Sequence, residues 1–351
     1  MALTPKDGWL YFLRDQDHRT GVVSSYVKIG LTNADRPVIE RVQEHQTGNP
    51  RRIFSSDELK VNAVDDAETH LHHLWALNRI RGEWFEMDDA QVKKAVQQAK
   101  DLNEAVAKRV KDFETIAVQS KLHSNGKTRS ATQDEIDLLA KLFEAKKKHM
   151  VAASKVKLFN EQIRKIMANS KGIVSVCELQ SKVIKSSINY GQIKKDNDVL
   201  VAKYTTTEMK LSASPFKADY TNPQLKGLDE NLDQEIKAVK KGQVSEKNPA
   251  NFTDKPESRT AEIEKIHQEY LASLGLESTL SIEVDLLAVA VKAAIREFDQ
   301  VDGLGKWIRA DKAKDTVDWK QFTLDHPTII EANINPEKHI VAMVVNPHRS
   351  Y

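Results

Sequence analysis

Residues 8–13 read Gly-Trp-Leu-Tyr-Phe-Leu, and residues 26–32 read Tyr-Val-Lys-Ile-Gly-Leu-Thr. Both runs are apolar, aromatic or β-branched, and a polar segment that contains Gly21 separates them. Short runs of this kind joined by turn-forming residues are typical of an antiparallel hairpin. Gly30 falls near the end of the second run, where the missing Cβ leaves room for a backbone or a phosphate. The sequence therefore predicts two paired strands in this region.

A short helix with a positive face follows the hairpin. Pro37 suits the first turn of a helix. Arg41 and His45 lie four residues apart, so they share one face of that helix. The run Thr-Gly-Asn-Pro at 47–50 ends the helix by turn chemistry.

The next elements are a third strand and a second helix. The strand falls either at 53–56 or at 58–64. From 65 to 75, apolar residues recur every three or four positions, which is the pattern of a helix with one buried face. Glu68 and His72 lie one turn apart beside that face. The sequence thus predicts an α+β domain with a small three-stranded antiparallel sheet flanked by helices.

These residues resemble the GIY-YIG nuclease superfamily, in the branch that carries Lys-Ile-Gly where the name-giving motif has Tyr-Ile-Gly and that occurs in phage and bacterial proteins. The resemblance covers the first quarter of the chain and includes the order of every element. Each motif is weak alone, but the order is specific. The matching residues are Leu10-Tyr11, Lys28-Ile29-Gly30-Leu31-Thr32, Arg41, the run His45-Gln46-Thr47-Gly48-Asn49-Pro50, Glu68 with His72, and Gly82-Glu83-Trp84-Phe85.

The resemblance implies metal-dependent hydrolysis of phosphodiester bonds, with Mg²⁺ or Mn²⁺ as the cofactor. Glu68 is implied as the carboxylate that holds the metal, since Mg²⁺ prefers oxygen ligands and keeps several waters. Arg41 would bind the scissile phosphate and stabilise the charge that grows in the transition state. Tyr11 is implied as the general base, with Lys28 as the cation that favours its phenolate.

The identity of the base stays open, because Lys28 stands where many members of the superfamily carry a second tyrosine. His45 competes with Tyr11 for the role. Its unperturbed pKa of about 6.5 needs less tuning at neutral pH than the tyrosine value of about 10.

Nearby polar residues have simpler interpretations. The cluster of His70, His72 and His73 invites a zinc site, but it lacks the Glu-x-x-His spacing and a distant third ligand. We interpret His72 as a hydrogen-bonded packing residue and Glu83 as a structural residue at the edge of the fold.

The overall composition limits the class of protein. Among 351 residues, 53 basic and 51 acidic side chains nearly cancel, so any nucleic-acid-binding face must be local. The single cysteine, Cys177, excludes a disulfide framework and fits a reducing compartment. The first residues lack an apolar signal region, and the longest apolar helix, at 286–295, is too short to cross a bilayer. We therefore expect a cytoplasmic protein of a bacterial host cell, phage-encoded by analogy with the resembling branch, that does not bind membranes.

The rest of the chain is helical with short strands. We predict a GIY-YIG-like nuclease domain at 1–89, a connector helix and linker at 90–131, and a helical hairpin with a small sheet at 132–225. A linker at 226–258 precedes a C-terminal α+β module at 259–351, which repeats the preceding module's order of elements in degenerate form. Expected helices span 89–120, 132–170, 259–274 and 280–298, and expected strands span 173–179, 199–205, 317–324, 328–332 and 339–345.

Two groups of basic residues are candidates for contact with DNA. Arg51 and Arg52 follow the first helix, and Lys146, Lys147 and Lys148 lie on the outer face of the long helix at 132–170. The lysines suit either a solvated coiled-coil face or a surface that tracks phosphates. Few aromatic residues interleave with them, which argues against base stacking on single strands.

Three functions fit these patterns. The favoured one is a metal-dependent DNA endonuclease whose C-terminal region binds the target. The alternative is a catalytically inactive nucleic-acid-binding protein with the same fold, and a third is a scaffold built on the long helices. The sequence does not distinguish DNA from RNA and does not indicate an oligomeric state.

Overall fold

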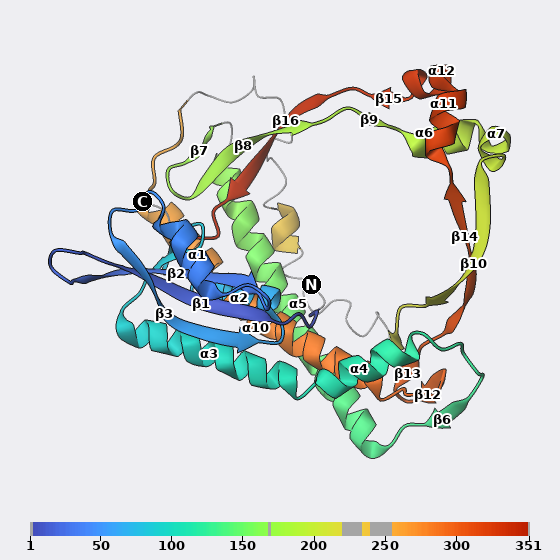
Figure 1. The fold of residues 1–351 in the computed structure, drawn as a ribbon, viewed down its shortest axis with the longest axis horizontal. Coiled ribbons are helices and arrows are strands. Elements are labelled where there is room, and N and C mark those ends of the chain that lie inside the picture. The colour runs from blue at the N-terminus through green and yellow to red at the C-terminus, as the bar shows by residue number, and fades with distance from the viewer. Residues whose placement is uncertain (1–2, 168–169, 220–233, 239–254, 350–351) are drawn as a thin grey trace.

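The computed structural model describes residues 3–167, 170–219, 234–238 and 255–349. It has a mixed α+β architecture, in which an N-terminal sheet with helices precedes two long helices and several small sheets (Figure 1). The N-terminal sheet is antiparallel and five-stranded, in the order β3-β1-β2-β5-β4. Its strands are β1 (Gly8–Gln16), β2 (Val23–Asn33), β3 (Arg52–Val61), β4 (Arg79–Arg81) and β5 (Trp84–Glu86).

The expected hairpin is confirmed, but the expectation of three strands is wrong. Strands β4 and β5 add a second hairpin, and Gly82 supports its tight turn with a φ of 56°. Three-residue strands are too short to show an alternating pattern in the sequence. Strand β3 covers the first stretch proposed for the third strand and residues 58–61 of the second, because a register shift opposite Phe12 and Leu13 lets one long strand follow β1. Residues 62–64 lie beyond it, and Val64 begins α2.

Helices cover both faces of this sheet. Tyr11 and Leu13 face helix α1 (Val38–Gln46), whereas Leu10 and Phe12 face the larger core that includes helices α2 (Val64–Leu74) and α3 (Asp89–Ala107). The alternation of side chains along one strand therefore assigns each residue of β1 to one of two cores. The single connector helix expected after the sheet is two helices, α3 and α4 (Val110–Gln119).

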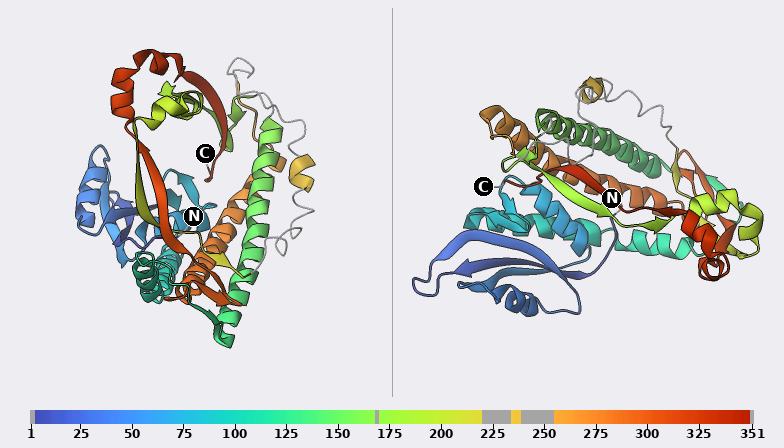
Figure 2. Two further views of the ribbon diagram at one scale, coloured as in Figure 1. Left: turned by 90° about the vertical axis from the view of Figure 1, so that its right-hand side faces the viewer. Right: turned by 90° about the horizontal axis from the view of Figure 1, so that it is seen from above.

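The C-terminal part is built on two long helices, α5 (Gln133–Met167) and α10 (Ala261–Ala293), which pack against each other along their lengths. We call this pair the bar. Helix α10 also packs against α2 and α4, so it lies between α5 and the N-terminal domain (Figure 2). No helix within the described residues is long and apolar enough to cross a membrane.

The long helices differ in part from what the sequence suggested. The pattern at 132–170 allowed a single helix or a hairpin, and α5 is a single helix, because it packs against α10 rather than against itself. The helices expected at 259–274 and 280–298 are one helix that continues through Gly275. A Cβ at Gly275 would lie 3.2 Å from the Leu74 Cα and 3.3 Å from the His73 carbonyl oxygen, so this glycine permits close contact with α2 rather than ending a helix.

A second unit arches from one end of the bar to the other. We call it the handle and define it as residues 177–213 together with 309–345. The two segments run antiparallel and pair in three places, and four short helices lie at the tip between them (Figure 1). Its elements are β8 (Cys177–Ile184) paired with β16 (Lys338–Val345), β9 (Ser187–Ile188) paired with β15 (Ile334–Asn335), β10 (Thr205–Ala213) paired with β14 (Arg309–Val317), and helices α6 (Tyr190–Asp196), α7 (Asp198–Ala202), α11 (Trp319–Asp325) and α12 (Pro327–Ala332).

Small sheets join the handle to the bar. At one end, β7 (Gly172–Ile173) pairs with β8. At the other end, four short strands form a sheet in the order β11-β13-β12-β6. These strands are β6 (Thr128–Ser130), β11 (Lys217–Ala218), β12 (Gln300–Asp302) and β13 (Gly305–Lys306).

The strands expected at 199–205, 317–324 and 328–332 are wrong, whereas the strand expected at 339–345 is confirmed as part of β16. The first three regions are mainly the helices of the tip. Short apolar runs do not distinguish a strand from a buried helix. Here Ile193 and Phe322 are buried together with residues from all four helices, which selects the helical form.

The two sides of the tip match each other. Asn189 begins α6 and accepts a hydrogen bond from the Gln192 backbone, and Asp318 begins α11 and accepts one from the Gln321 backbone. The rings of Tyr190 and Trp319, one from each side, lie 4.5 Å apart. This likeness agrees with the expected repeat, but the division of the chain into domains stays a prediction. The linker expected at 226–258 lies mostly outside the described residues.

Gly275→Val should weaken the joint between α10 and α2, because its branched side chain must push against the α2 backbone. We expect a loss of about 1–3 kcal/mol of folding free energy, the usual cost of overpacking. Ala272→Val, at an exposed site on the same helix, is the matched control. Equal urea midpoints for the two variants would contradict the packing role of Gly275.

Candidate active site

The site is centred on Tyr11 and Gly30, which face each other across β1 and β2. A Cβ at Gly30 would lie only 2.6 Å from the Tyr11 Oη and 2.7 Å from ring carbons of Tyr11. The tyrosine ring therefore lies flat over the glycine and is fully buried. The space that the sequence led us to reserve for a backbone or a phosphate is filled by this ring.

Arg41 is the cation beside the Tyr11 hydroxyl. Helix α1 brings the Arg41 Nε within 3.4 Å of the Tyr11 Oη, to which it donates a long hydrogen bond. The other side of the guanidinium contacts Glu44 on the same helix. Burial raises the pKa of Tyr11 above its usual value, and Arg41 offsets only part of that rise. The phenol is therefore neutral near pH 7.

Lys28 does not act as the cation that we expected at Tyr11. Its buried ammonium group donates to the carboxylate of Glu83 instead. Glu83 precedes β5, which pairs with β2 so that Trp84 stands opposite Lys28. The pKa of Glu83 lies below its usual value, because the hydrogen bond and charge of Lys28 outweigh the effect of burial. Glu83 is thus part of the site, in addition to the structural role inferred from the sequence.

His45 lies one helical turn beyond Arg41, in a positive environment. Burial lowers its pKa below the usual value, and the charges of Lys28 and Arg41 lower it further. Its Nε2 atom is buried and has no hydrogen-bond partner among the described residues. His45 is therefore a neutral imidazole at pH 7 with one nitrogen available to accept a proton.

Glu68 brings a second carboxylate to the site from helix α2. It is half-buried, and within the described residues it forms no hydrogen bond or ion pair. Burial and, to a smaller extent, the nearby Glu83 carboxylate together raise its pKa to about 7. Lys28 and Arg79 act weakly in the opposite direction. Glu68 is therefore held close to protonation at neutral pH.

The histidines of α2 have structural roles. The His72 Nε2 lies 2.9 Å from the Ile29 carbonyl oxygen, as expected for a packing residue. The His70 Nδ1 lies 2.9 Å from the Ser278 Oγ of α10. Burial lowers the pKa of both imidazoles to about 4, so both are neutral. Among the described residues, no cluster of three or more His, Cys, Asp or Glu side chains could hold a metal ion by protein ligands alone.

The basic residues proposed for DNA contact fall into different surroundings. Arg51 binds Asp15 and Asp17, so much of its charge is neutralised. Arg52 is exposed at the start of β3. Residues 146–148 lie midway along α5, and α10 separates that helix from α2.

Arg79 was missed by the sequence interpretation. It lies in β4, and its charge acts on both Glu68 and Glu83. Burial lowers the pKa of Arg79, and the two carboxylates partly restore it. The only signal in the sequence was the position of Arg79 just before the Gly-Glu-Trp-Phe motif at 82–85.

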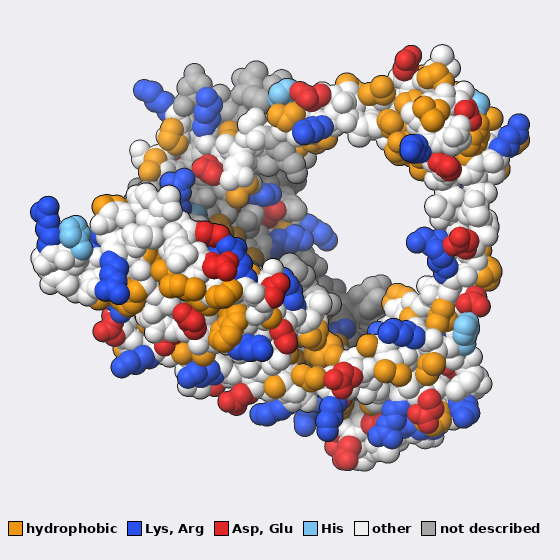
Figure 3. All heavy atoms as spheres, viewed as in Figure 1, with side chains coloured by type: hydrophobic (Ala, Val, Ile, Leu, Met, Phe, Trp, Pro, Cys, Tyr) orange, Lys and Arg blue, Asp and Glu red, His pale blue; other side chains and the backbone are white. Residues whose placement is uncertain are grey.

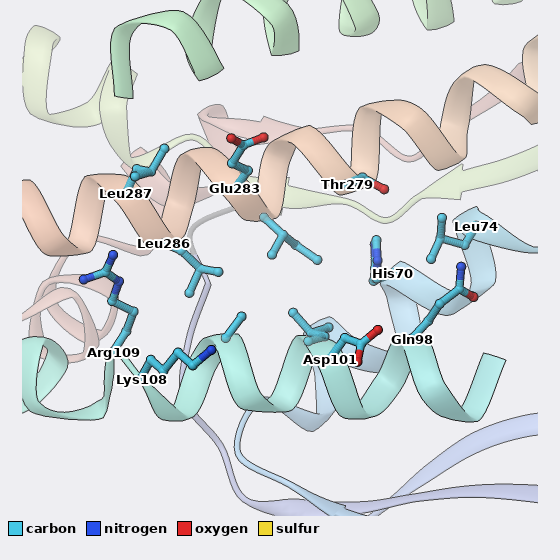
Figure 4. A pocket seen from close by; sticks show the side chains of 13 residues that line it. His70, Leu74, Gln98, Asp101, Lys108, Arg109, Thr279, Glu283, Leu286 and Leu287 are labelled. Carbon is cyan, nitrogen blue, oxygen red and sulfur yellow. The ribbon is translucent and has the colours of Figure 1, made fainter. Parts of the chain in front are cut away.

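A separate pocket lies between α2, α3 and α10 and has a volume of about 720 Å³ (Figure 4). Apolar side chains, among them Leu74 and Leu286, make up much of its wall. His70 reaches this pocket from α2, whereas Glu68, two residues earlier, lies on a different face of the same helix. The pocket is therefore distinct from the site around Tyr11.

The candidate site thus combines a buried tyrosine, an arginine, a neutral histidine and a half-buried glutamate at an antiparallel sheet. In a comparison with known families, residues 8–100 match the T5orf172 domain, a phage-associated domain of the GIY-YIG/HNH-like endonuclease group. The match indicates a nuclease-like or nucleic-acid-related role for this part of the chain. No curated protein and no solved structure gives a significant match.

Glu68→Gln should change how stability depends on pH. Because the folded-state pKa of Glu68 is raised to about 7, folding takes up a proton between pH 4.5 and 7. The free energy of unfolding therefore falls as pH rises through this window, and the cost is fully present above pH 7. We expect the variant to melt at a higher temperature than the parent at pH 8 in EDTA, and the difference to shrink towards pH 5.

Thermal melts at several pH values measure this effect, with Glu104→Gln on the exposed face of α3 as the control. A difference that stays constant from pH 5 to pH 8 would show that Glu68 ionises normally in the folded protein.

Proposed function

We propose that the N-terminal domain is a metal-dependent endonuclease that hydrolyses phosphodiester bonds in DNA. The observation that carries this proposal is that Arg41, His45 and Glu68 lie in one site with Tyr11: a cation, a neutral imidazole and a carboxylate that a bound cation would keep ionised. The match to an endonuclease-group domain over 8–100 supports the same function.

In this proposal Arg41 binds the scissile phosphate. Its guanidinium is held by Tyr11 on one side and contacts Glu44 on the other. The phosphodiester would displace Glu44, since its two non-bridging oxygens accept the same paired donors as a carboxylate. The charge of Arg41 then stabilises the additional negative charge of the transition state.

We assign the general base to His45 rather than to Tyr11. A base must be unprotonated before it acts, and His45 has a lowered pKa and an unbonded, buried Nε2. Tyr11 has a raised pKa, so its phenol stays protonated at neutral pH and cannot accept a proton from water. Its proposed role is to position Arg41 through the contact between the Tyr11 Oη and the Arg41 Nε.

Glu68 is the proposed ligand for Mg²⁺ or Mn²⁺. A carboxylate that is half-buried, lacks a hydrogen-bonded partner and has a pKa near 7 fits a divalent cation, because the ion would stabilise its charged form. Mg²⁺ commonly uses one or two carboxylates and keeps several waters, so one such ligand is sufficient. When bound, the ion supplies positive charge to the phosphate. Glu83 is neutralised by Lys28 and is not assigned as a ligand.

The second candidate is a domain that binds nucleic acid without cutting it. The observation that favours it is the pairing of Lys28 with Glu83, which leaves Tyr11 without the lysine that we expected to activate it. Binding without metal-dependent cleavage would identify this function.

Supercoiled plasmid provides the first test of cleavage. We expect the parent protein with Mg²⁺ to yield nicked or linear DNA, and Glu68→Ala or added chelator to abolish the product. Glu104→Ala is the control for a lost surface carboxylate. If the parent fails on plasmid and on branched, single-stranded and RNA substrates alike, the binding function replaces the nuclease.

Two substitutions identify the base. His45→Ala should lower the single-turnover cleavage rate by about 10²- to 10⁴-fold, the usual contribution of a general base. Tyr11→Phe keeps the ring over Gly30 and removes only the hydroxyl, so we expect a smaller loss. A larger loss for Tyr11→Phe than for His45→Ala would return the role of base to Tyr11.

A further inference from the structure

The bar and the handle form a closed ring. At one end, Ile173, Val176 and Cys177 are buried against Ile163 of α5 and Tyr270 of α10. At the other end, Val301, Leu304 and Trp307 are buried against residues of α5 and α10. The space-filling view shows an opening that passes through the molecule inside this ring (Figure 3). The described residues of the bar, the handle and their two joints therefore form a ring around this opening.

The arm formed by β10 and β14 is a bare two-stranded ribbon. All nine residues of each strand are paired, and from 311 to 316 every residue of β14 is exposed. A nine-residue strand spans about 30 Å, so the arm holds the tip far from the bar. A ribbon without a core is of marginal stability by itself. It is fixed at its base, where the buried Arg309 binds Asp299 at 2.9 Å.

Positive charge gathers on one face of this arm. In the observed register Lys210 stands opposite Lys312, and Lys314 stands opposite Glu208, so all four side chains share one face. Like charges directly opposite each other destabilise a sheet. Glu208 pairs with Lys210 at 2.7 Å, whereas Lys312 forms no ion pair within the described residues. The face therefore carries three lysines and one glutamate, an excess of two positive charges that acidic residues of the same face do not balance.

This face is turned towards the opening. Figure 3 shows basic side chains of the arm that extend into the opening beside an acidic one, with further Lys or Arg side chains at other points of the rim. Between β10 and β14, the exposed basic residues are the three lysines of the shared face, since Arg309 is buried. The opposite face carries Met209, Asp311 and Asp315.

We propose that the ring encircles duplex DNA, with Lys210, Lys312 and Lys314 on its phosphates. Phosphates supply the negative charge that this face lacks, and neutralising them releases counterions. Neither β10 nor β14 contains an aromatic residue, which disfavours a single strand held by base stacking. The choice of DNA rests on the proposed nuclease function, and the ring would hold that substrate beside the catalytic domain.

Trapping on DNA of defined topology tests encirclement. The protein carries Glu68→Ala and the buffer contains EDTA, so that no DNA is cut. A ring around DNA should survive a wash at 1 M salt, where the screening length of about 3 Å removes ordinary phosphate contacts. We expect salt-resistant retention on closed circles that is lost when a restriction enzyme linearises them, or retention on linear DNA only when both ends are blocked after loading. Loss of all protein from every DNA form at 1 M salt would overturn encirclement.

Charge variants test the arm. Replacing the three lysines of the arm by Gln should lower the slope of log K against log salt by about 3, one unit for each lost phosphate contact. Replacing them by Glu should abolish trapping. The control replaces Lys93, Lys100 and Lys111, which are exposed on α3 and α4, by Glu. Equal slopes and equal trapping for the arm and control variants, with unchanged circular dichroism, would overturn the assignment of these lysines.

The two proposals fail separately. Trapping is measured with cleavage switched off, so it can be lost while Glu68-dependent nicking of plasmid persists. The converse result, trapping without nicking by the parent, would leave the ring as a DNA-binding device and remove the nuclease function.

Discussion

The close contact between Gly275 and helix α2 joins the two halves of this protein. The helix that carries Glu68 on one face presents Leu74 and His70 to α10 on another. Because α10 also forms half of the bar, the position of Glu68 and the position of the ring depend on the same helix. A hydrogen bond from the Arg349 backbone to the Arg79 carbonyl adds a second attachment, at the hairpin next to Glu83. The candidate active site is therefore fixed relative to the opening from two sides.

Within the site, burial shifts the pKa values of Glu68 and His45 in opposite directions. Glu68 is raised to about 7, whereas His45 is lowered below its ordinary value by burial and by positive neighbours. Opposite pKa shifts of two titratable groups set different roles for them at one pH. Lys28 and Glu83 form an ion pair within the site and neutralise each other. In the proposed function, a phosphate would therefore bind to Arg41 rather than to Lys28.

Much of the N-terminal domain could be predicted from local patterns. The apolar run around Tyr11, the proline before α1 and the spacing in α2 are each contained within a dozen residues, and these elements formed as expected. Contacts between distant residues were not predictable: Lys28 and Glu83 are 55 positions apart, and no periodicity links them. The raised pKa of Glu68 likewise depends on burial that only the folded chain defines. In the handle, β10 and β14 pair across about a hundred residues, so the sequence indicated short apolar runs but not the ring they form.

The handle consists of two chain segments, and each of them runs the whole distance from one end of the bar to the other. A single break in the backbone, for example by a protease at the exposed β14, would leave the other segment to span the same distance. Each of the two segments alone therefore connects the two ends of the bar. The connection between the two ends of the bar therefore does not depend on an intact peptide bond at any single position of the handle.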